Sequence, residues 1–256
     1  MGSDLFDISG RLALVTGSSR GLGRELALAL AEAGARVVLH GRDAQALSDA
    51  ADRIEAATGA RPDSVRFDVT SADEVAAGVE ALVASHGVPD ILVNNAGLQR
   101  RAPIQEFAPA DWDAVIASNL SSMFYVSRQV TPGMVERGSG KVINIASVQS
   151  KLARQTIAPY SASKGGVAML TQGMAADLAR HNVQANAISP GYFATEMNRA
   201  LVEDPEFDAW LTQRTPAQRW GNVSELRGAL LFLASDASSF VSGHNLVVDG
   251  GMTAVV

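Results

Sequence analysis

Short runs of β-branched and aliphatic residues alternate along the chain with long stretches rich in Ala and Leu. The short runs predict strands near residues 12–16, 36–40, 64–68, 90–94, 141–146, 183–188 and 246–248. In the long stretches apolar residues recur every three or four positions, which predicts helices near residues 20–33, 43–57, 71–86, 111–136, 158–180 and 223–234. Strands that alternate with helices in this way are typical of βαβ units and a parallel sheet.

Some of the predicted strands are apolar on both faces, as residues 91–93 and 142–145 show. Such strands lie in the middle of a parallel sheet that helices cover on both sides. We therefore expect an α/β fold with a doubly wound, Rossmann-type parallel sheet of about seven strands. The 256 residues suit a single domain that spans residues 1–256.

One segment interrupts the alternation of strands and helices. Residues 191–221 are rich in Phe, Trp, Pro and charged residues, and they are too many for an ordinary connection. We expect this segment to contain short helices and to act as a lid over a substrate.

The composition excludes several classes of protein. The chain has no Cys, which rules out disulfides, thiolate nucleophiles and Cys-ligated metals. A net charge of −6 argues against a nucleic-acid surface, which needs clustered Lys and Arg. No apolar run reaches the ~18 residues needed to cross a bilayer, and residues 1–10 do not resemble a signal peptide. We expect a cytoplasmic protein that binds small molecules, with no membrane or nucleic-acid partner.

The sequence gives little support for a metal site, for a nucleotide-hydrolysing site or for a serine hydrolase site. The four histidines are scattered without paired spacing, so we expect no metal. Residues 138–141 look like half of a P-loop, but the upstream glycine is absent and Val142 follows the lysine. No G-x-S-x-G motif is present.

A glycine-rich turn links the first predicted strand to the first predicted helix. Residues 16–23 contain the spacing G-x-x-x-G-x-G, and the helix is predicted to open at about Arg20. Glycines here let the backbone approach a pyrophosphate, and the amides and dipole of a helix N-terminus stabilise an anion. The alternative is that the glycines only form a tight turn. The strand-to-helix position favours a dinucleotide site made by Gly17, Ser19, Arg20, Gly21, Leu22 and Gly23.

The end of the second predicted strand bears on which dinucleotide binds. An acidic residue about here would bind the ribose 2′-hydroxyl of NAD, but no acid stands at His40 and Arg42 follows. Arg20 and Arg42 offer two guanidinium groups to a 2′-phosphate, so we expect NADP to be preferred, with NAD as the alternative. Otherwise both arginines are solvated and Asp43 caps the next helix.

Tyr160 and Lys164 stand one helical turn apart on the same face of a predicted helix. A free tyrosine titrates near ~10, so acid/base work at neutral pH asks for a fall of about three units. An ammonium ~4 Å away at an effective dielectric near 20 supplies about that much. We expect Lys164 to lower the pKa of Tyr160.

Two other strands end beside the same edge of the sheet. Ser147 follows the strand near 141–146, where its hydroxyl can hold a carbonyl or alcohol oxygen. The strand near 90–94 leads into residues 94–97, whose small side chains leave room for a dinucleotide. Each residue alone has a structural explanation, such as a helix cap or a buried amide.

Taken together and in order, residues 16–23, 94–97 and 190–191 with Asn119, Ser147, Tyr160 and Lys164 resemble the short-chain dehydrogenase/reductase family. The resemblance implies that Tyr160 transfers a proton, that Lys164 also holds the nicotinamide ribose, and that hydride passes between substrate and nicotinamide. It implies that Ser147 orients the reacting oxygen and that Asn119 completes a proton relay through water. It further implies cofactor contacts from Arg42, Asp68, Val69, Asn95, Ala96, Gly97, Tyr160, Lys164, Pro190, Gly191, Phe193 and Thr195.

Within this family the chain resembles the gluconate 5-dehydrogenases, also called 5-keto-D-gluconate 5-reductases, over residues 39–43, 94–101, 149–158, 190–197, 200–205, 214–221 and 249–253. Guanidinium and amide groups suit a polyhydroxy carboxylate. The substrate residues we expect are Arg100, Arg101, Ser147, Gln149, Lys151, Arg154, Tyr160 and Tyr192. Lys151 departs from the pattern, because similar sequences carry an acid there; it either attracts an anion or points to solvent.

Two other functions stay open. A 3-oxoacyl carrier-protein reductase shares the four catalytic residues, and a dinucleotide-binding sensor needs no turnover. The resemblance also implies a homotetramer formed through the helices near 111–136 and 158–180 and the C-terminal segment.

Overall fold

A computed structural model of the chain describes residues 4–195 and 198–255. Within these residues seven strands form one parallel sheet in the order β3-β2-β1-β4-β5-β6-β7. The strands are β1 (Leu12–Val15), β2 (Arg36–Gly41), β3 (Asp63–Arg66), β4 (Ile91–Asn94), β5 (Gly140–Ile145), β6 (Val183–Pro190) and β7 (Asn245–Val248). Every pairing is parallel, and the strand order turns back between β1 and β4. The predicted doubly wound α/β fold is confirmed.

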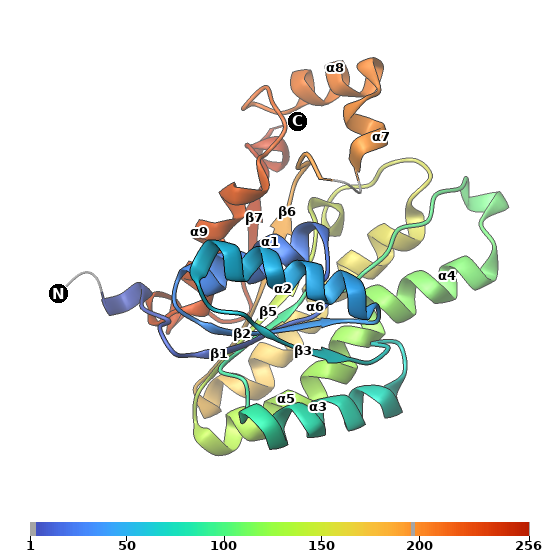
Figure 1. Cartoon of the computed structure of the whole chain (residues 1–256). Coiled ribbons are helices and arrows are strands. Elements are labelled where there is room, and N and C mark those ends of the chain that lie inside the picture. The colour runs from blue at the N-terminus through green and yellow to red at the C-terminus, as the bar shows by residue number, and fades with distance from the viewer. Residues whose placement is uncertain (1–3, 196–197, 256) are drawn as a thin grey trace.

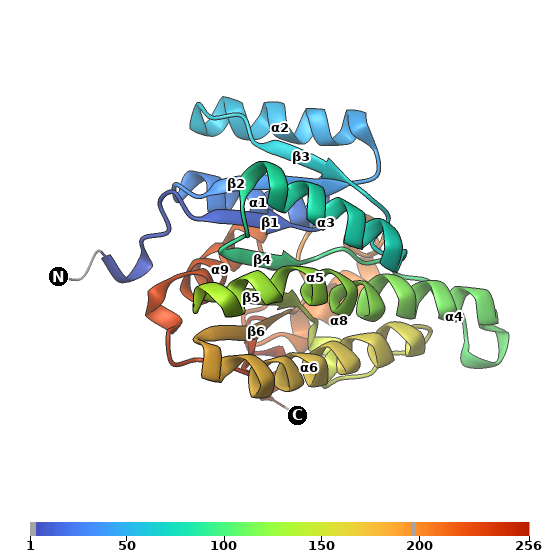
Figure 2. The same cartoon turned by 90° about the horizontal axis from the view of Figure 1, so that it is seen from below.

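Helices cover both faces of the sheet (Figures 1 and 2). Their bounds are α1 (Gly21–Glu32), α2 (Ala44–Thr58), α3 (Ala72–His86), α4 (Pro109–Ile116), α5 (Ser122–Arg137), α6 (Ala158–Leu178), α7 (Arg199–Val202), α8 (Pro205–Arg214) and α9 (Arg227–Ala234). Helices α1, α2 and α9 pack on one face, and α3, α5 and α6 pack on the other. Among the described residues, none of the helices combines the length and the apolar character needed to span a membrane.

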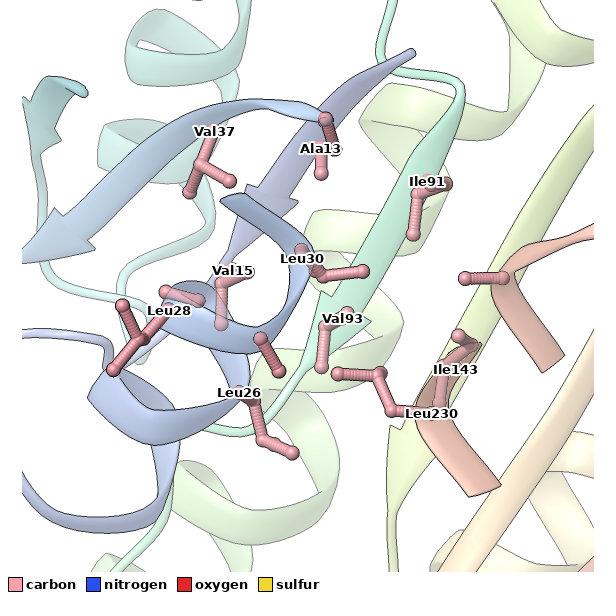
Figure 3. Packing of buried hydrophobic residues seen from close by; sticks show 14 of the residues in the cluster. Ala13, Val15, Leu26, Leu28, Leu30, Val37, Ile91, Val93, Ile143 and Leu230 are labelled. Carbon is pink, nitrogen blue, oxygen red and sulfur yellow. The ribbon is translucent and has the colours of Figure 1, made fainter. Parts of the chain in front are cut away.

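The alternation of side chains along β1 divides the core between these two faces. Ala13 and Val15 pack toward α1 and α9, whereas Leu12 and Leu14 pack toward α3 and α5. Figure 3 shows the first of these clusters, in which side chains from four strands meet Leu30 of α1 and other residues of α1 and α9. Because both faces of the central strands are buried, these strands read as continuous apolar runs in the sequence.

Polar residues define where several helices begin. The carboxylate of Asp43 accepts hydrogen bonds from the amides of Gln45 and Ala46 at the start of α2, and Ser71 caps α3 in the same way. The interpretation of Asp43 as a helix cap is therefore correct. Gly59 ends α2 in the left-handed conformation with a φ of 76°.

The helix predicted near 111–136 is not uniform. It begins at Pro109 as α4, widens into the π-helical turn η3 (Ala117–Ser121), and continues as α5. Single π-turns inside α-helices mark functional sites in many proteins. The turn contains Asn119, which bonds to a loop far away in the sequence.

The segment 191–221 contains α7 and α8, and Figure 1 shows these two helices standing apart from those that cover the sheet. The short helices predicted here are thus present, while residues 196 and 197 lie outside the described residues. Four aromatic side chains of this segment, Tyr192, Phe207, Trp210 and Trp220, pack against one another at centroid distances of 5.2 to 6.3 Å.

Candidate active site

A cavity of about 830 Å³ opens along the carboxyl ends of the strands. Residues that follow five different strands line it: Gly17 after β1, Asp68 after β3, Asn95 after β4, Ser147 after β5 and Gly191 after β6. The carboxyl edge near a reversal of strand order is where open α/β sheets bind their ligands.

The structure brings all predicted cofactor residues together on this cavity. They are Gly17, Ser19, Arg20, Gly21, Leu22, Gly23, Arg42, Asp68, Val69, Asn95, Ala96, Gly97, Tyr160, Lys164, Pro190, Gly191, Phe193 and Thr195.

The glycine turn leaves no room for a side chain at Gly17 or at Gly23. Gly17 has a φ of 63°, and a Cβ atom on it would lie 2.9 Å from the Cα of Ala96. A Cβ atom on Gly23 would lie 2.3 Å from the carbonyl oxygen of Gly17. The side chain of the N-cap residue Arg20 does not cap the amides at the start of α1, which suits these amides to bind an anion. The turn therefore fits a pyrophosphate.

Asn95 and Thr16 hold this turn against β4. The amide nitrogen of the Asn95 side chain donates to the carbonyl oxygens of Thr16 and Gly17 at 3.0 and 3.1 Å. In return, the hydroxyl of Thr16 accepts from the backbone amides of Asn95 and Ala96. These bonds fix the two loops that flank the switch point of the sheet.

At the end of β2, the structure shows which residues lie beside the glycine turn and beside Asp68. The side chain of His40 is buried, and Gly41 is the residue whose missing side chain leaves space beside Ser19, since a Cβ atom there would lie 3.3 Å from the Ser19 Cβ. The Arg42 side chain is 75% exposed, and its guanidinium lies 3.1 Å from the carboxylate of Asp68. Hydrogen bonds from Thr70, together with Arg42, lower the pKa of Asp68.

Tyr160 and Ser147 lie together on the cavity, from α6 and the end of β5. Burial raises the pKa of the Tyr160 phenol, and the neighbouring Ser147 hydroxyl opposes this effect. The pKa of Tyr160 was expected to fall, so this expectation is wrong for the structure described here. A phenol that stays protonated at neutral pH is suited to donate a proton.

The reason lies in where the ammonium of Lys164 is held. Its Nζ atom donates a 2.6 Å hydrogen bond to the carbonyl oxygen of Ile145 and lies 5.6 Å from the centroid of the Tyr160 ring. Burial also lowers the pKa of Lys164, to about 8. Desolvation thus disfavours both the ammonium and the phenolate.

Asn119 is fully buried within the π-helical turn. Its Oδ1 accepts from the amide of Leu98 at 2.7 Å, and its Nδ2 donates to the Leu98 carbonyl and the Ser163 hydroxyl at 3.0 and 3.1 Å. The side chain therefore ties the loop after β4 to α6, and its own polar atoms are satisfied.

The predicted substrate residues divide into two groups. Arg101, Ser147, Gln149, Arg154, Tyr160 and Tyr192 line the cavity. Arg100 does not, because its side chain lies in an exposed loop and pairs with Asp111 at 3.4 Å. Lys151 is exposed just beyond the turn at residues 148–150 and is also absent from the cavity wall. The structure therefore does not bring these two residues to the cavity, and Lys151 points to solvent, the alternative given above.

Two guanidinium groups lie on the substrate side of the cavity. Burial lowers the pKa of Arg101, and the positive charge of Arg154 lowers it further. The guanidinium of Arg154 lies 5.1 Å from the centroid of the Phe207 ring, and its Nε atom is buried without a hydrogen-bond partner. Within residues 4–195 and 198–255, neither arginine pairs with a carboxylate. This pair of positive charges favours an anionic ligand.

Sequence reasoning missed several cavity residues. Leu98, Ile157 and Leu201 give part of the wall an apolar surface. Leu201 belongs to α7, so the segment predicted as a lid reaches the cavity. Isolated apolar residues carry no signal in the sequence that separates a cavity wall from the core.

Comparison with known proteins identifies the family. Residues 17–253 match the family model described as Enoyl-(Acyl carrier protein) reductase. The chain is 54% identical over 250 residues to a gluconate 5-dehydrogenase of Gluconobacter oxydans, covering 98% of this chain and 97% of that one. The chain belongs to the short-chain dehydrogenase/reductase family. It is an NAD(P)-dependent oxidoreductase that acts on a CH–OH group.

Two further relatives agree with this family membership. A 5-keto-D-gluconate 5-reductase of Escherichia coli is 51% identical over 254 residues, which are 99% of this chain and 100% of that one. The crystal structure of a gluconate 5-dehydrogenase from Burkholderia cenocepacia in complex with NADP and tartrate superimposes with a TM-score of 0.95, at 53% identity and 99% coverage of both chains. The resemblance found in the sequence is thereby confirmed.

Proposed function

We propose that this enzyme interconverts a keto sugar acid and the corresponding hydroxy acid with NADP(H), the pair being of the 5-ketogluconate and gluconate type. One observation carries the proposal: Arg101 and Arg154 lie on the same cavity as Tyr160 and Ser147. A substrate with a carbonyl at one position and a carboxylate further along its chain can engage both groups at once. Relatives that share about half of this sequence over its full length bear the names of enzymes for such substrates.

The proton chemistry belongs to Tyr160. When bound, NADPH supplies the hydride that reduces the substrate carbon. The Tyr160 hydroxyl donates its proton to the carbonyl oxygen during reduction, and the phenolate takes it back during oxidation. Ser147, which lies with Tyr160 on the cavity, holds the same oxygen of the substrate. The ammonium of Lys164, fixed by the Ile145 carbonyl, stabilises the phenolate that is left.

Arg20, Arg42 and Gly41 support the preference for NADP over NAD. Gly41 leaves space beside Ser19, and the guanidinium groups of Arg20 and Arg42 border the same end of the cavity. A 2′-phosphate needs such space and such positive charge. The similar enzyme from Burkholderia cenocepacia was crystallised with NADP.

The polar end of the substrate meets Arg101, Gln149, Arg154 and Tyr192. Gln149 is 8% exposed and its Oε1 atom has no hydrogen-bond partner among the described residues, which suits it to accept a hydrogen bond from a substrate hydroxyl. The two guanidinium groups pair with the carboxylate. The pKa of Tyr192 is raised by burial, which keeps its hydroxyl protonated and able to donate.

The segment 191–221 acts as the lid of this site. Its aromatic cluster packs over Arg154 through Phe207, and Leu201 of α7 lines the cavity. Closure of such a segment excludes water from the reacting groups.

Steady-state assays test the substrate class. We expect NADPH oxidation with 5-ketogluconate to exceed, in kcat/KM, the reaction with an uncharged ketose of similar length by about tenfold or more, the ratio that a charge-assisted hydrogen bond supports. Equal rates with both substrates would contradict a carboxylate site. Turnover of a carrier-linked 3-oxoacyl thioester alone would support the reductase alternative. NADPH binding without turnover of any ketone would support the sensor.

We further propose a homotetramer in the cytoplasm. Phe124 of α5 and Met169 of α6 are large apolar side chains that are 48% and 64% exposed, and burial against another copy would remove them from water. The cytoplasm is the compartment we propose because NADP(H) is a polyanion that does not cross membranes unaided. Light scattering of the purified enzyme tests the tetramer, and fractionation of cells tests the location.

A further inference from the structure

His40 joins two loops that line the cofactor end of the cavity. Its side chain, 2% exposed, comes from β2. The backbone amide of Gly17 donates to its Nδ1 at 3.2 Å, and its Nε2 lies 3.1 Å from the carbonyl oxygen of Phe67. A backbone amide only donates and a carbonyl only accepts, so the ring is neutral with its proton on Nε2.

The environment of the ring keeps this single tautomer. Burial lowers the pKa of His40 to about 4, with Asp68 acting in the opposite direction and Arg42 in the same one. The ring also packs against the Phe67 side chain at a centroid distance of 4.1 Å. At neutral pH the imidazole therefore accepts from one loop and donates to the other at the same time.

Both loops contact the place where the dinucleotide binds. Gly17 belongs to the glycine turn, and Asp68 and Val69 directly follow Phe67; all of them line the cavity. Gly17 also lies close to Ala96 in the loop after β4, since a Cβ atom on Gly17 would lie 2.9 Å from the Ala96 Cα.

The backbone of His40 reinforces the connection. Its carbonyl oxygen accepts from the amide of Ser18 at 2.9 Å, and its amide donates to the Ser18 hydroxyl at 2.9 Å. The main chain therefore holds Ser18 to β2, whereas only the imidazole spans from Gly17 to Phe67. Substitution of the side chain leaves the main-chain bonds in place and removes the bridge.

We propose that His40 is a positioning residue that sets the spacing between the glycine turn and the loop at residues 67–69, and that this spacing determines the affinity for NADP(H). The inference rests on the proposed use of NADP(H). His40 touches no reacting atom, so its effect falls on cofactor binding and leaves the chemical step unchanged.

Three substitutions separate the two hydrogen bonds. His40→Asn keeps an acceptor near the position of Nδ1, His40→Gln keeps a donor near the position of Nε2, and His40→Leu keeps neither. We expect His40→Leu, which loses both hydrogen bonds, to raise the Kd and KM for NADPH by about tenfold or more, with kcat within about twofold of the wild type. We expect His40→Asn to recover most of this loss, because the bond to the glycine turn is the one nearest the pyrophosphate.

A substitution at another buried, hydrogen-bonded residue tests whether a loss of stability alone raises the Kd for NADPH. Thr171 is also fully buried and hydrogen-bonded, to Asn144 at 2.9 Å, and it lies outside the cavity wall. Thr171→Val should lower the midpoint of thermal unfolding without changing the Kd for NADPH. Circular dichroism of every variant establishes that it is folded, and NADPH fluorescence gives the Kd.

The proposal is overturned if His40→Asn and His40→Leu have the same Kd for NADPH, or if kcat falls while KM stays constant. Should His40→Leu fail to fold, the Kd values of His40→Asn and His40→Gln for NADPH test the proposal instead. Only His40→Asn should approach the wild-type Kd, and equal values for the two variants would overturn the proposal. If the wild type binds NADH instead of NADPH, the proposed cofactor preference fails. In that case, the same ranking of the variants by their Kd for NADH would still support the role of His40.

Discussion

The ammonium of Lys164 lies 5.6 Å from the centroid of the Tyr160 ring, while its hydrogen bond is made to the backbone of β5. The lysine is therefore held by the sheet and not by the phenol. Both groups are shifted toward their neutral forms, because burial raises the pKa of Tyr160 and lowers that of Lys164 to about 8. This arrangement keeps the proton on Tyr160, as the proposed transfer to a substrate carbonyl requires.

Replacing Tyr160 by Phe removes the proton donor and keeps the ring. We expect kcat to fall by about 10²- to 10⁴-fold, the usual contribution of a general acid, with the Kd for NADPH nearly unchanged. Steady-state kinetics and NADPH fluorescence measure the two quantities. Full turnover by Tyr160→Phe would contradict the assignment of this residue.

The two directions of the reaction should respond differently to pH. Reduction needs the protonated phenol, and the raised pKa of Tyr160 keeps it protonated at neutral pH, so kcat/KM for reduction should be flat there and fall only in alkali. Oxidation needs the phenolate and should accelerate as the pH rises. Profiles of both directions from pH 6 to 10 check this, and an oxidation optimum below pH 7 would argue against Tyr160 as the base.

Arg101 and Arg154 should determine affinity for the substrate anion. We expect Arg101→Ala and Arg154→Ala each to raise the KM for the sugar acid by about tenfold to a hundredfold, the loss of a charge-assisted hydrogen bond, with the KM for NADPH unchanged. Arg100 is the matched control, because it is adjacent in sequence but pairs with Asp111 outside the cavity. Arg100→Ala should leave the KM for both ligands unchanged.

The cofactor preference should depend on Arg42. Its guanidinium pairs with Asp68 beside the cavity, where it can turn to a 2′-phosphate. We expect Arg42→Ala to lower kcat/KM for NADPH by about tenfold and to leave that for NADH nearly constant. If the ratio of the two values does not change, Arg42 has no part in the preference.

Lys141 should lower the stability of the protein at neutral pH. It is 5% exposed, its Nζ lies 3.4 Å from the Ser238 hydroxyl, and burial lowers its pKa from 10.5 to about 8. We expect Lys141→Met to increase the free energy of unfolding at pH 7 by about 1 to 2 kcal/mol, because a desolvated charge is replaced by an apolar chain. Urea unfolding measures it.

The pH dependence of this effect has a definite sign. Between about pH 8 and 10.5 the unfolded chain binds more protons at this lysine than the folded protein does, so wild-type stability rises with pH in this window. Below about pH 8 both states are protonated and the penalty is constant. The advantage of Lys141→Met should therefore shrink as the pH approaches 10.5. A variant less stable than the wild type at pH 7 would show that the ammonium stabilises the fold.

Much of the fold could be read from local patterns. The apolar runs at residues 91–93 and 142–145 predict buried central strands, and the glycine spacing at residues 16–23 predicts a phosphate-binding turn. These features depend on near neighbours in the chain, as do the single-turn separation of Tyr160 and Lys164 and the cap at Asp43. The regular arrangement of βαβ units then leaves few ways to bring the strand ends together.

The remaining features depend on contacts between residues far apart in the chain. Arg100 and Arg101 are equivalent in sequence, yet only one lines the cavity. In the sequence His40 shows only that an acid is missing at the end of the second strand, whereas in the structure its ring bridges two loops that are 50 residues apart, from Gly17 to Phe67. Asn119 lies in the π-helical turn, and its side chain bonds to Leu98 and Ser163, which are distant in the sequence.

The sequence by itself determined the doubly wound sheet and the dinucleotide turn, because side-chain periodicity and short spacings govern both, and it singled out Tyr160 as the candidate proton donor. Only the tertiary structure decided which arginines line the cavity and in which direction the pKa of Tyr160 moves. Desolvation is the physical reason, since the free energy of a charge depends on how much water the whole fold removes from it.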